Sequence, residues 1–400
     1  MKFSVRSVAL LLGILLLSAC GALERRQAVP SQDVELAQIP GIPDARFWPM
    51  SSNEALINLA IESIGLEQLA REQDGLEVEL PPAVFLAISG GGDNGAFGAG
   101  LLNGWSARGD RPQFKVVTGV STGALIAPFA FLGAGYDDEL SQVYTSISQK
   151  DIFEKRSILS ALTQDGLGDT TPLYKLIRNY VDETFLAEVA NQYHRGRLLF
   201  IGTTNLDAQQ PVIWNMGAIA AANIAESAEL FHRIMLASAS IPGAFPPVMI
   251  DVEVAGRRYQ EMHVDGGVMA QVFLYPPAIA GARSASKLHE NRERRAYIIR
   301  NARLDANWSD VNRSTVSITG KAIITLLQSQ GFGDLFRIYL TTLEDGVEYN
   351  LAYIDSDFDA IHREEFDREY MQALYRYAFD LAEKGYQWHR YPPGYEPATE

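Results

Sequence analysis

The chain has 400 residues, of which 47% are hydrophobic and 21% are charged, a composition typical of a folded globular protein and unlike that of a disordered or fibrous one. Asp and Glu number 49 against 34 Lys and Arg, and the formal net charge is −15. This balance argues against nucleic acid as a partner, because phosphate backbones are bound by clustered Lys and Arg.

The first 19 residues are typical of a secretory signal peptide. A basic start at Lys2 and Arg6 precedes an apolar run from 8 to 17, which is too short to span a membrane in the mature protein. The run ends in Leu17-Ser18-Ala19-Cys20, which resembles the lipobox of bacterial lipoproteins. Cys20 is the only cysteine of the chain, so no disulfide can form within it.

The resemblance implies that cleavage leaves Cys20 as the first residue, carrying a diacylglyceryl group and an N-acyl chain. Several acyl chains together anchor a protein stably to a bilayer. Gly21 follows the cysteine, where an Asp would resemble the signal for retention in an inner membrane. We therefore expect an exported protein anchored to a bacterial membrane, at the periplasmic face of the outer membrane if the source has two. The alternative is an incidental cysteine beside an ordinary cleavage site.

Three further segments are expected along the chain. Residues 20–50 are expected to form a lipidated tether, because they contain four prolines and little hydrophobic periodicity. The folded domain is expected over 51–390, beginning with a helix capped by Ser51 or Ser52. The last residues, 391–400, contain three prolines and are expected to form a loose tail.

Within the domain, short apolar segments alternate with helical ones. Strands are expected at 83–88, 114–118, 198–203, 211–214, 259–264, 296–300 and 349–354, and helices at 94–108, 122–132, 137–147, 173–193, 228–237, 314–342 and 366–384. This alternation predicts an α/β fold in which a mainly parallel sheet is covered by helices on both faces.

Gly119-Val120-Ser121-Thr122-Gly123 fits the pattern G-x-S-x-G between an expected strand and an expected helix. Such a turn presents the serine hydroxyl at the carboxyl end of the strand, and small flanking residues let the backbone bend tightly and a substrate approach. The N-terminal amides of the following helix favour developing negative charge. We therefore predict that Ser121 is a nucleophile; the alternative is a plain tight turn.

A second motif, Ser89–Gly95, follows the first expected strand and contains three successive glycines, Gly90, Gly91 and Gly92. Their amides are not covered by side chains and are candidate donors to the oxyanion of a tetrahedral intermediate. Gly90, Gly92 and Gly95 also fit the dinucleotide pattern G-x-G-x-x-G, but that site requires an acidic residue about 20 positions later. The second strand ends in 118–121 without one, which argues against a nucleotide. A purely structural glycine turn is the remaining alternative.

The third motif, Asp265-Gly266-Gly267, closes the strand expected at 259–264 and places a carboxylate where a serine on a neighbouring strand can meet it. Alone, Asp-Gly is a common turn pair. Together, the glycine motif (90–95), G-x-S-x-G (119–123) and Asp-Gly-Gly (265–267) resemble the patatin-like phospholipase family. The segments 203–207 and 240–247 are similar to further parts of that family, and the resemblance covers 84–267.

The family implies a three-layer α/β/α sandwich and a lipid acyl hydrolase with a Ser–Asp dyad, without a catalytic histidine, cofactor or metal. Carried over, Ser121 attacks an ester carbonyl, and Asp265 accepts its proton and later returns it to the leaving alcohol. The amides of Gly90, Gly91, Gly92 and Asp93 hold the oxyanion, and membrane lipids are the substrate. Many family members carry Arg or Lys where Asn94 stands, which weakens the case for a preference for anionic phospholipids.

Two alternatives belong to other classes. A Ser–His–Asp esterase requires a histidine within reach of Ser121 and a carboxylate. His263 lies on the strand face of Asp265 but about 6.6 Å behind it, and is expected to pack in the core or at an edge. His289 is expected in a solvated loop, whereas His362 and His389 have the chain order of α/β-hydrolases but lie in no motif, and are expected at the surface. The second alternative is a non-enzymatic lipoprotein that binds lipid or a protein partner. A lid is expected at 146–171.

Overall fold

The computed structural model describes residues 25–51, 54–77, 79–156, 165–222, 224–275, 292–305 and 310–395. The expected signal peptide and the lipidation site Cys20 lie outside the described residues, as do 396–400 of the expected tail and 157–164 of the expected lid. No helix in the described part of the chain is both long enough and apolar enough to cross a membrane.

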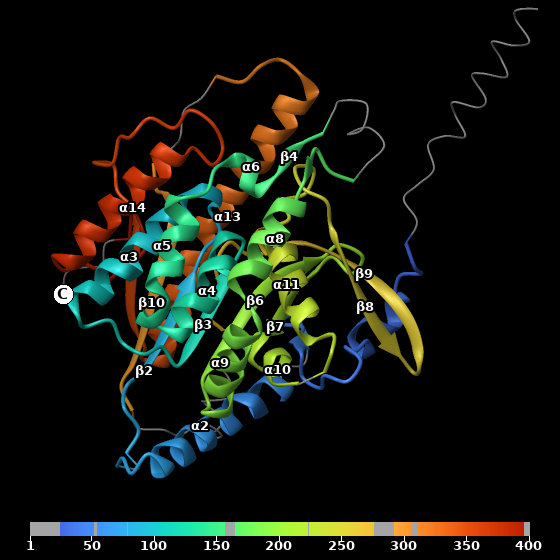
Figure 1. The fold of residues 1–400 in the computed structure, drawn as a ribbon, viewed down its shortest axis with the longest axis vertical. Coiled ribbons are helices and arrows are strands. Elements are labelled where there is room, and N and C mark those ends of the chain that lie inside the picture. Colours follow the sequence, from blue (N-terminus) through green and yellow to red (C-terminus); the bar gives the residue numbers. More distant parts are fainter. Residues whose placement is uncertain are drawn as a thin grey trace, which may run out of the picture.

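A nine-stranded sheet runs through the centre of the described residues (Figure 1). Five strands lie parallel in the order β6-β3-β2-β10-β11, and β7 and then β1 extend the sheet antiparallel beyond β6. The hairpin of β8 and β9 joins through β9, which pairs antiparallel with β6. The strands are β1 (Arg46–Phe47), β2 (Ala83–Ile88), β3 (Val116–Val120), β6 (Leu198–Asn205), β7 (Gln210–Asn215), β8 (Val248–Val254), β9 (Arg257–Asp265), β10 (Arg294–Arg303) and β11 (Glu348–Ile354), with β4 (Glu154–Lys155) and β5 (Gly168–Asp169) as a separate pair.

Helices cover both faces of this sheet. One layer contains α3 (Gly95–Arg108), α4 (Thr122–Leu132), α5 (Asp137–Thr145), α6 (Gln149–Ile152), α8 (Thr171–Tyr180), α9 (Glu183–His194), α10 (Met216–Ala221), α11 (Ser227–Ser238) and α14 (Arg368–Glu383). The other layer contains α2 (Glu54–Gln73) and α13 (Thr315–Asp345). Short 3₁₀ helices lie at η1 (Ser31–Leu36), η2 (Gly92–Asn94), η3 (Ala134–Tyr136) and η4 (Gly266–Val268).

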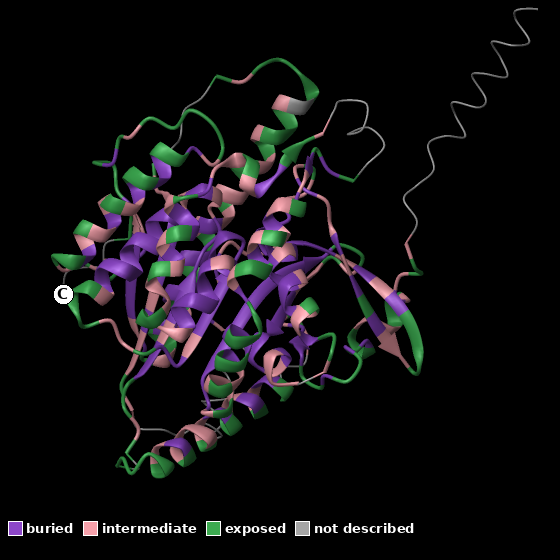
Figure 2. Cartoon of the chain, viewed as in Figure 1, coloured by how far each residue is buried: buried purple, intermediate pink, exposed green. Residues whose placement is uncertain are grey.

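Alternate residues of each strand face opposite layers, because successive side chains of a strand point to opposite sides. In β6, Leu199 and Ile201 belong to the core under α4 and α11, whereas Leu198 and Phe200 pack with Leu56 of α2. The buried residues accordingly follow the sheet and the inner sides of the helices (Figure 2). The predicted three-layer α/β/α sandwich with a mainly parallel sheet is confirmed.

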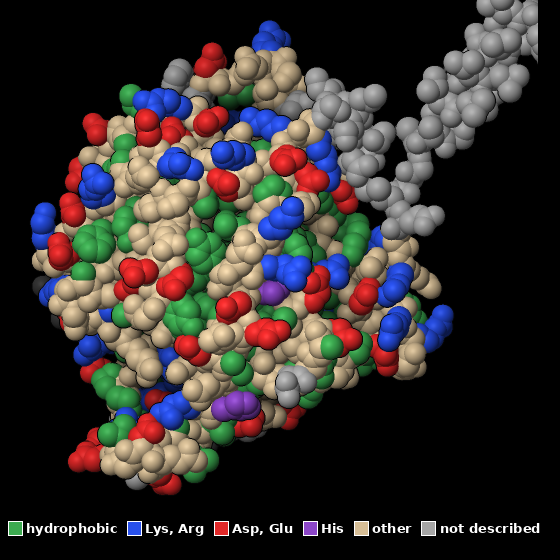
Figure 3. All heavy atoms as spheres, viewed as in Figure 1, with side chains coloured by type: hydrophobic (Ala, Val, Ile, Leu, Met, Phe, Trp, Pro, Cys, Tyr) green, Lys and Arg blue, Asp and Glu red, His purple; other side chains and the backbone are tan. Residues whose placement is uncertain are grey.

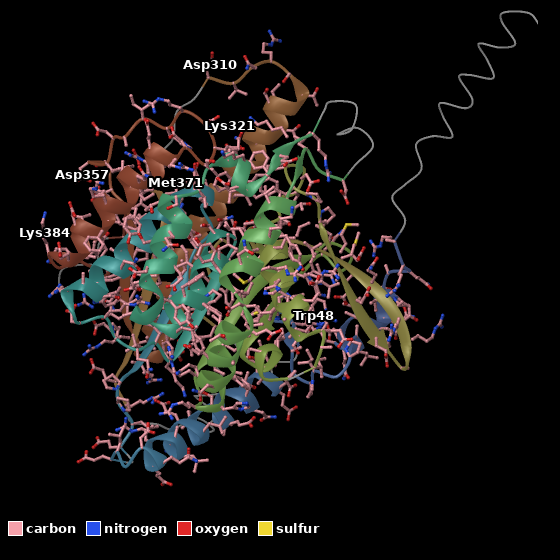
Figure 4. All side chains as sticks on the ribbon, viewed as in Figure 1. Trp48, Asp310, Lys321, Asp357, Met371 and Lys384 are labelled. Atoms are coloured by element: carbon pink, nitrogen blue, oxygen red, sulfur yellow. The ribbon has the colours of Figure 1, made fainter. Side chains whose placement is uncertain are left out.

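The segment expected to be a tether is packed against the domain over its described part, from residue 25 to 50. β1 pairs with β7, and Arg46 forms a buried ion pair with Glu261 of β9. Ile42, Phe47 and Trp48 are buried, and Trp48 lies beside the sheet in Figure 4. The apolar residues of this segment are spaced irregularly between prolines, so they show neither a helical nor a strand period in the sequence.

Candidate active site

Ser121 stands at the point where β3 ends and α4 begins, as the pattern of its neighbours predicts. Its φ of 55° and ψ of −125° are uncommon for a residue with a side chain, and such strain is typical of a nucleophile at a sharp turn. The turn needs the two flanking glycines, because a Cβ at Gly119 would clash with the carbonyl of Gly123, and a Cβ at Gly123 with that of Ile88. The amide of Ser121 donates to the hydroxyl of Ser238 (3.0 Å), which fixes the turn.

The sheet brings Asp265 to the end of the strand that carries Ser121. β3 stops at Val120, which pairs with Gly202 of β6. β9 runs in the opposite direction along the same strand and stops at Asp265, which pairs with Thr203. The two strands therefore meet end to end along β6, so that residues 144 positions apart in the chain become neighbours.

The Asp265 carboxyl is buried and holds its proton unusually tightly. Burial raises its pKa from 3.8 to about 7, against the opposing effects of the Ser121 hydroxyl and the Gly267 amide, which lower it. Oδ1 accepts a hydrogen bond from the Gly267 amide (2.7 Å), whereas Oδ2 is buried and has no partner at hydrogen-bond geometry. One carboxylate oxygen is thus left for a proton from a neighbouring hydroxyl.

The glycine motif passes directly over the nucleophile. A Cβ at Gly90 would lie 3.1 Å from the Cβ of Ser121 and 2.9 Å from Oε1 of Gln271, so a side chain here would occupy the space above the serine. A Cβ at Gly91 would clash with the carbonyl of Asn301. Gly91 therefore requires bare backbone, whereas a side chain at Gly90 would have to displace Gln271 and press on Ser121.

The predicted set of oxyanion donors needs one correction. The Gly90 amide donates to the carbonyl of Gln271 (3.0 Å) and is not available to a substrate. The amides of Gly91, Gly92 and Asp93 donate to no backbone acceptor in the described part of the chain, so these three are the candidate donors. The carbonyl that accepts from the Gly90 amide belongs to the loop after Asp265, about 180 residues later in the chain. The sequence around Gly90 does not predict this contact.

Two buried side chains hold the glycine loop in place, that of Ser89 at the start of the glycine motif and that of Asn301 outside the motifs. Asn301, at the end of β10, donates from its side-chain amide to the carbonyl of Ser89 (2.9 Å) and accepts from the amide of Gly98 (3.0 Å). The Ser89 hydroxyl accepts from the amide of Asn301 (2.9 Å) and donates to the carbonyl of Gly90 (2.7 Å). Both side chains are buried, so these bonds are shielded from water. Asn301 was not predicted, since a single Asn carries no pattern, and Ser89 was part of the motif but had been given no role.

Asp93 and Asn94 are held by the segment before α14. The Asp93 carboxylate accepts from Nε2 of His362 (2.7 Å) and from the amide of Phe366 (2.9 Å), and the hydroxyl of Tyr370 donates to Asn94 (2.6 Å). The hydrogen bond with Asp93 raises the pKa of His362. His362 lies at the surface, as expected, and the structure adds that its partner is Asp93 and not the serine.

The remaining described histidines have partners away from the nucleophile. His263 bonds Thr203 (2.9 Å) and Glu261 (3.0 Å) in the core, as expected from its position behind Asp265. His232 bonds the carbonyl of Val181 (2.7 Å), and His389 stacks on Tyr353. None of the histidines in the described ranges bonds Ser121 or Asp265; His289 lies outside those ranges.

An apolar cavity of about 510 Å³ is lined by sequence neighbours of Ser121 and Asp265, although neither of these two residues is part of its wall. Its wall includes Val120 and Gly266, which precede Ser121 and follow Asp265 in the sequence, and Gly202, which pairs with Val120. The wall continues along Met269 and Phe273. This shape and lining suit a hydrocarbon chain. Among the described residues, no group of three or more His, Cys, Asp or Glu is arranged to hold a metal ion.

Residues 86–277 match the family model described as patatin-like phospholipase. The chain has the patatin fold. The matched range includes all three motifs, whereas Asn301, His362 and Tyr370, which hold the glycine loop, lie beyond its end. No curated protein sequence matches the chain.

Two solved structures are similar to the chain. The crystal structure of VipD from Legionella pneumophila is 10% identical, with a TM-score of 0.38 over 78% of this chain and 68% of VipD. The crystal structure of the type III effector protein ExoU is 14% identical, with a TM-score of 0.24 over 78% of this chain and 55% of ExoU.

Proposed function

We propose that the protein hydrolyses the acyl esters of lipids, with Ser121 as nucleophile and Asp265 as general base. The phospholipase family model supports lipid hydrolysis as the activity. The observation that carries the dyad is the buried Asp265 carboxyl, with a pKa of about 7 and a free oxygen, at the end of a strand that abuts the strand of Ser121. A base with a pKa near the working pH combines a useful ionised fraction with a real affinity for the proton.

In the proposed reaction, ionised Asp265 accepts the proton of Ser121 as the hydroxyl oxygen attacks the ester carbonyl. The amides of Gly91, Gly92 and Asp93 stabilise the oxyanion, and loss of one such donor typically raises the barrier by about 2.7–4 kcal/mol. Asp265 then gives the proton to the leaving alcohol. Water, deprotonated by the same carboxylate, releases the acyl group from Ser121.

Two features support a lipid as substrate. The apolar cavity next to Val120 and Gly266 provides a place for an acyl chain. The first half of α13, from 315 to 330, contains no buried described side chain and exposes Ile318, Ile324 and Leu326. It rises at the top of Figure 1, and Lys321 marks it in Figure 4. Exposed apolar side chains on one helix suit contact with a lipid surface better than contact with water.

The head group is proposed to be zwitterionic or neutral. The glycine loop carries Asp93 and Asn94 and no cation, and His362 beside Asp93 is exposed for two fifths of its side chain. Acidic and basic side chains are interspersed on the face shown in Figure 3. Neither feature offers an anionic head group a dedicated binding site.

The proposed location is a bacterial membrane, to which lipid chains on Cys20 anchor the exported protein, at the periplasmic face of the outer membrane where the source has two. The sequence Leu17-Ser18-Ala19-Cys20 after an apolar run supports this. Metabolic labelling with palmitate should label the wild-type protein and leave Cys20→Ala unlabelled. An unlabelled wild-type protein would rule the anchor out and leave the hydrolase proposal untouched.

The decisive test of the activity compares the wild type with Ser121→Ala. A fluorophosphonate probe should label the wild type and not the variant, and a mixed panel of glycerolipids should yield free fatty acid only with the wild type. Each of the six histidines, changed singly to Ala, should keep the activity within about tenfold, because a dyad needs no imidazole. Loss of activity in one histidine variant with unchanged folding would favour a Ser–His–Asp triad instead.

A further inference from the structure

We infer that the protein has a second binding site, which takes a long-chain carboxylate at the end of the sheet opposite Ser121. A cavity of about 130 Å³ lies there between α2 and the first residues of β2, β3 and β6. Its wall is mostly hydrocarbon, including Leu56 of α2, Phe85 of β2, and Leu198 and Phe200 of β6. It is distinct from the active site, because β3 separates Val116 at this cavity from Ser121 by about 17 Å.

One cationic side chain in this wall has no counter-charge among the residues that the structure describes. Arg294 begins β10 and lines the cavity, and the side chains of 294, 296 and 298 share the sheet face that also carries Phe85. Nε and Nη1 of Arg294 are buried and bond to no acceptor. Buried guanidinium donors are normally paired, because leaving them unpaired is strongly unfavourable. An anion in the cavity would provide the missing acceptor.

The neighbouring cations behave differently, which makes Arg294 the specific contact. Lys115 and Arg292 line the same cavity, and each forms an ion pair with Glu67 of α2, at 2.6 and 3.1 Å. That carboxylate is therefore already committed to two partners. Arg294 has unpaired N–H groups on both Nε and Nη1, and guanidinium N–H groups are strong donors to the oxygens of a carboxylate.

The apolar part of the cavity determines the rest of the ligand. A volume of about 130 Å³ accepts a head group and the first methylenes of a single chain, and is too small for a two-chain lipid. Ile213, Phe273, Leu274 and Tyr275 line both this cavity and the larger one beside Val120 and Gly266. The two cavities therefore lie next to each other along this apolar wall. The ligand class that fits is a fatty-acid anion, which is also the acyl product that the proposed reaction releases.

Binding is best tested on the intact Ser121→Ala protein, so that turnover cannot interfere and the result does not depend on the proposed activity. Titration with cis-parinaric acid, a fluorescent long-chain carboxylate, should give saturable binding that Arg294→Met weakens about tenfold or more, the value expected for loss of a charged hydrogen-bond pair. The matched control is Arg295→Met, which removes a partly exposed arginine on the other face of the same strand, paired with Glu293, and should bind as before. The corresponding long-chain alcohol, which carries no charge, should bind equally to Ser121→Ala with and without Arg294→Met.

Three further measurements keep the result interpretable. Replacement of Ala60, whose side chain lines the cavity, by Trp should abolish binding of both the acid and the alcohol. Arg294→Met should unfold at the same temperature as the parent or higher, because it removes an unpaired buried charge, which shows that weaker binding is not misfolding. A lysophosphatidic acid that competes better than oleate would assign the site to a phosphate head group. Unchanged affinity of Arg294→Met for cis-parinaric acid, or equal loss with Arg295→Met, would overturn the inference.

Discussion

Asp265→Asn should make the protein inactive and, at neutral and alkaline pH, more stable. Burial raises the pKa of this carboxyl from 3.8 to about 7 in the folded state. Below pH 3.8 the carboxyl is neutral in both states and has no effect on folding. Between the two pKa values the unfolded chain ionises while the folded one stays protonated, so the free energy of unfolding falls as the pH rises. Above pH 7 the carboxyl is ionised in both states, and the loss of unfolding free energy no longer changes with pH.

The size of this effect follows from the shift itself. Each pKa unit corresponds to about 1.4 kcal/mol, so a shift from 3.8 to about 7 lowers the stability at pH 8 by about 4 kcal/mol. Asparagine carries no charge to bury, but its oxygen accepts a weaker hydrogen bond from the Gly267 amide than the carboxylate does. The expected gain at pH 8 is therefore about 2–4 kcal/mol, and activity should fall by about 10²- to 10⁴-fold with the loss of the base.

Urea unfolding of the wild type and Asp265→Asn between pH 4 and pH 9 measures the difference directly. The gap in unfolding free energy should be small at pH 4 and widen to a plateau above pH 7, and the kcat/KM of the wild type should rise through the same range. Ser121→Ala serves as the control. It keeps the Asp265 carboxyl but removes the hydroxyl that lowers the pKa of that carboxyl, so the decrease in its unfolding free energy should continue to a higher pH than in the wild type. A variant that is less stable than the wild type at pH 8, or a gap that does not change with pH, would refute a buried base at Asp265.

Three other substitutions follow from the contacts of the glycine loop. Gly90→Ala should lower kcat/KM by about 100-fold and slow fluorophosphonate labelling, because its Cβ would lie 3.1 Å from that of Ser121; an unchanged labelling rate would contradict this. Asn301→Ala should lower the unfolding free energy by about 1–3 kcal/mol, seen in urea unfolding, because the carbonyl of Ser89 and the amide of Gly98 lose their partners. His362→Ala should change kcat/KM at pH 8 by less than about tenfold, since it supports Asp93 without touching Ser121; a loss as large as that of Ser121→Ala would argue for a catalytic imidazole.

The sequence was most informative where function depends on short stretches of backbone. The turn at Ser121 and the Asp-Gly-Gly turn are local, and each is recognisable from glycines that the turn geometry requires. The positions of Asn301, Gln271 and His362 depend instead on contacts between segments roughly 180 to 270 residues apart, for which single residues carry no signal. The assignment of Gly90 as a donor failed for the same reason.

In the fold, too, local patterns were predictable and contacts between distant segments were not. The alternation of strands and helices predicted the layered sheet, but not that β9 would run antiparallel and meet β3 end to end along β6. β8 was not predicted, although its alternating buried and exposed residues are the usual signal of a half-buried strand. The packed segment before α2 escaped prediction because its apolar residues follow no period and are anchored through Arg46 and a distant Glu261.

That packed segment limits how far an anchored enzyme can travel. Arg25 forms a salt bridge with Asp207, so the folded body begins only five residues after Cys20. Five residues span at most about 17 Å, far less than the length of the tether of about thirty residues that the prolines predicted. An enzyme acylated at Cys20 would stay in contact with the lipid head groups. It would hydrolyse lipids only of the leaflet in which it is anchored, because a facing bilayer lies beyond its reach.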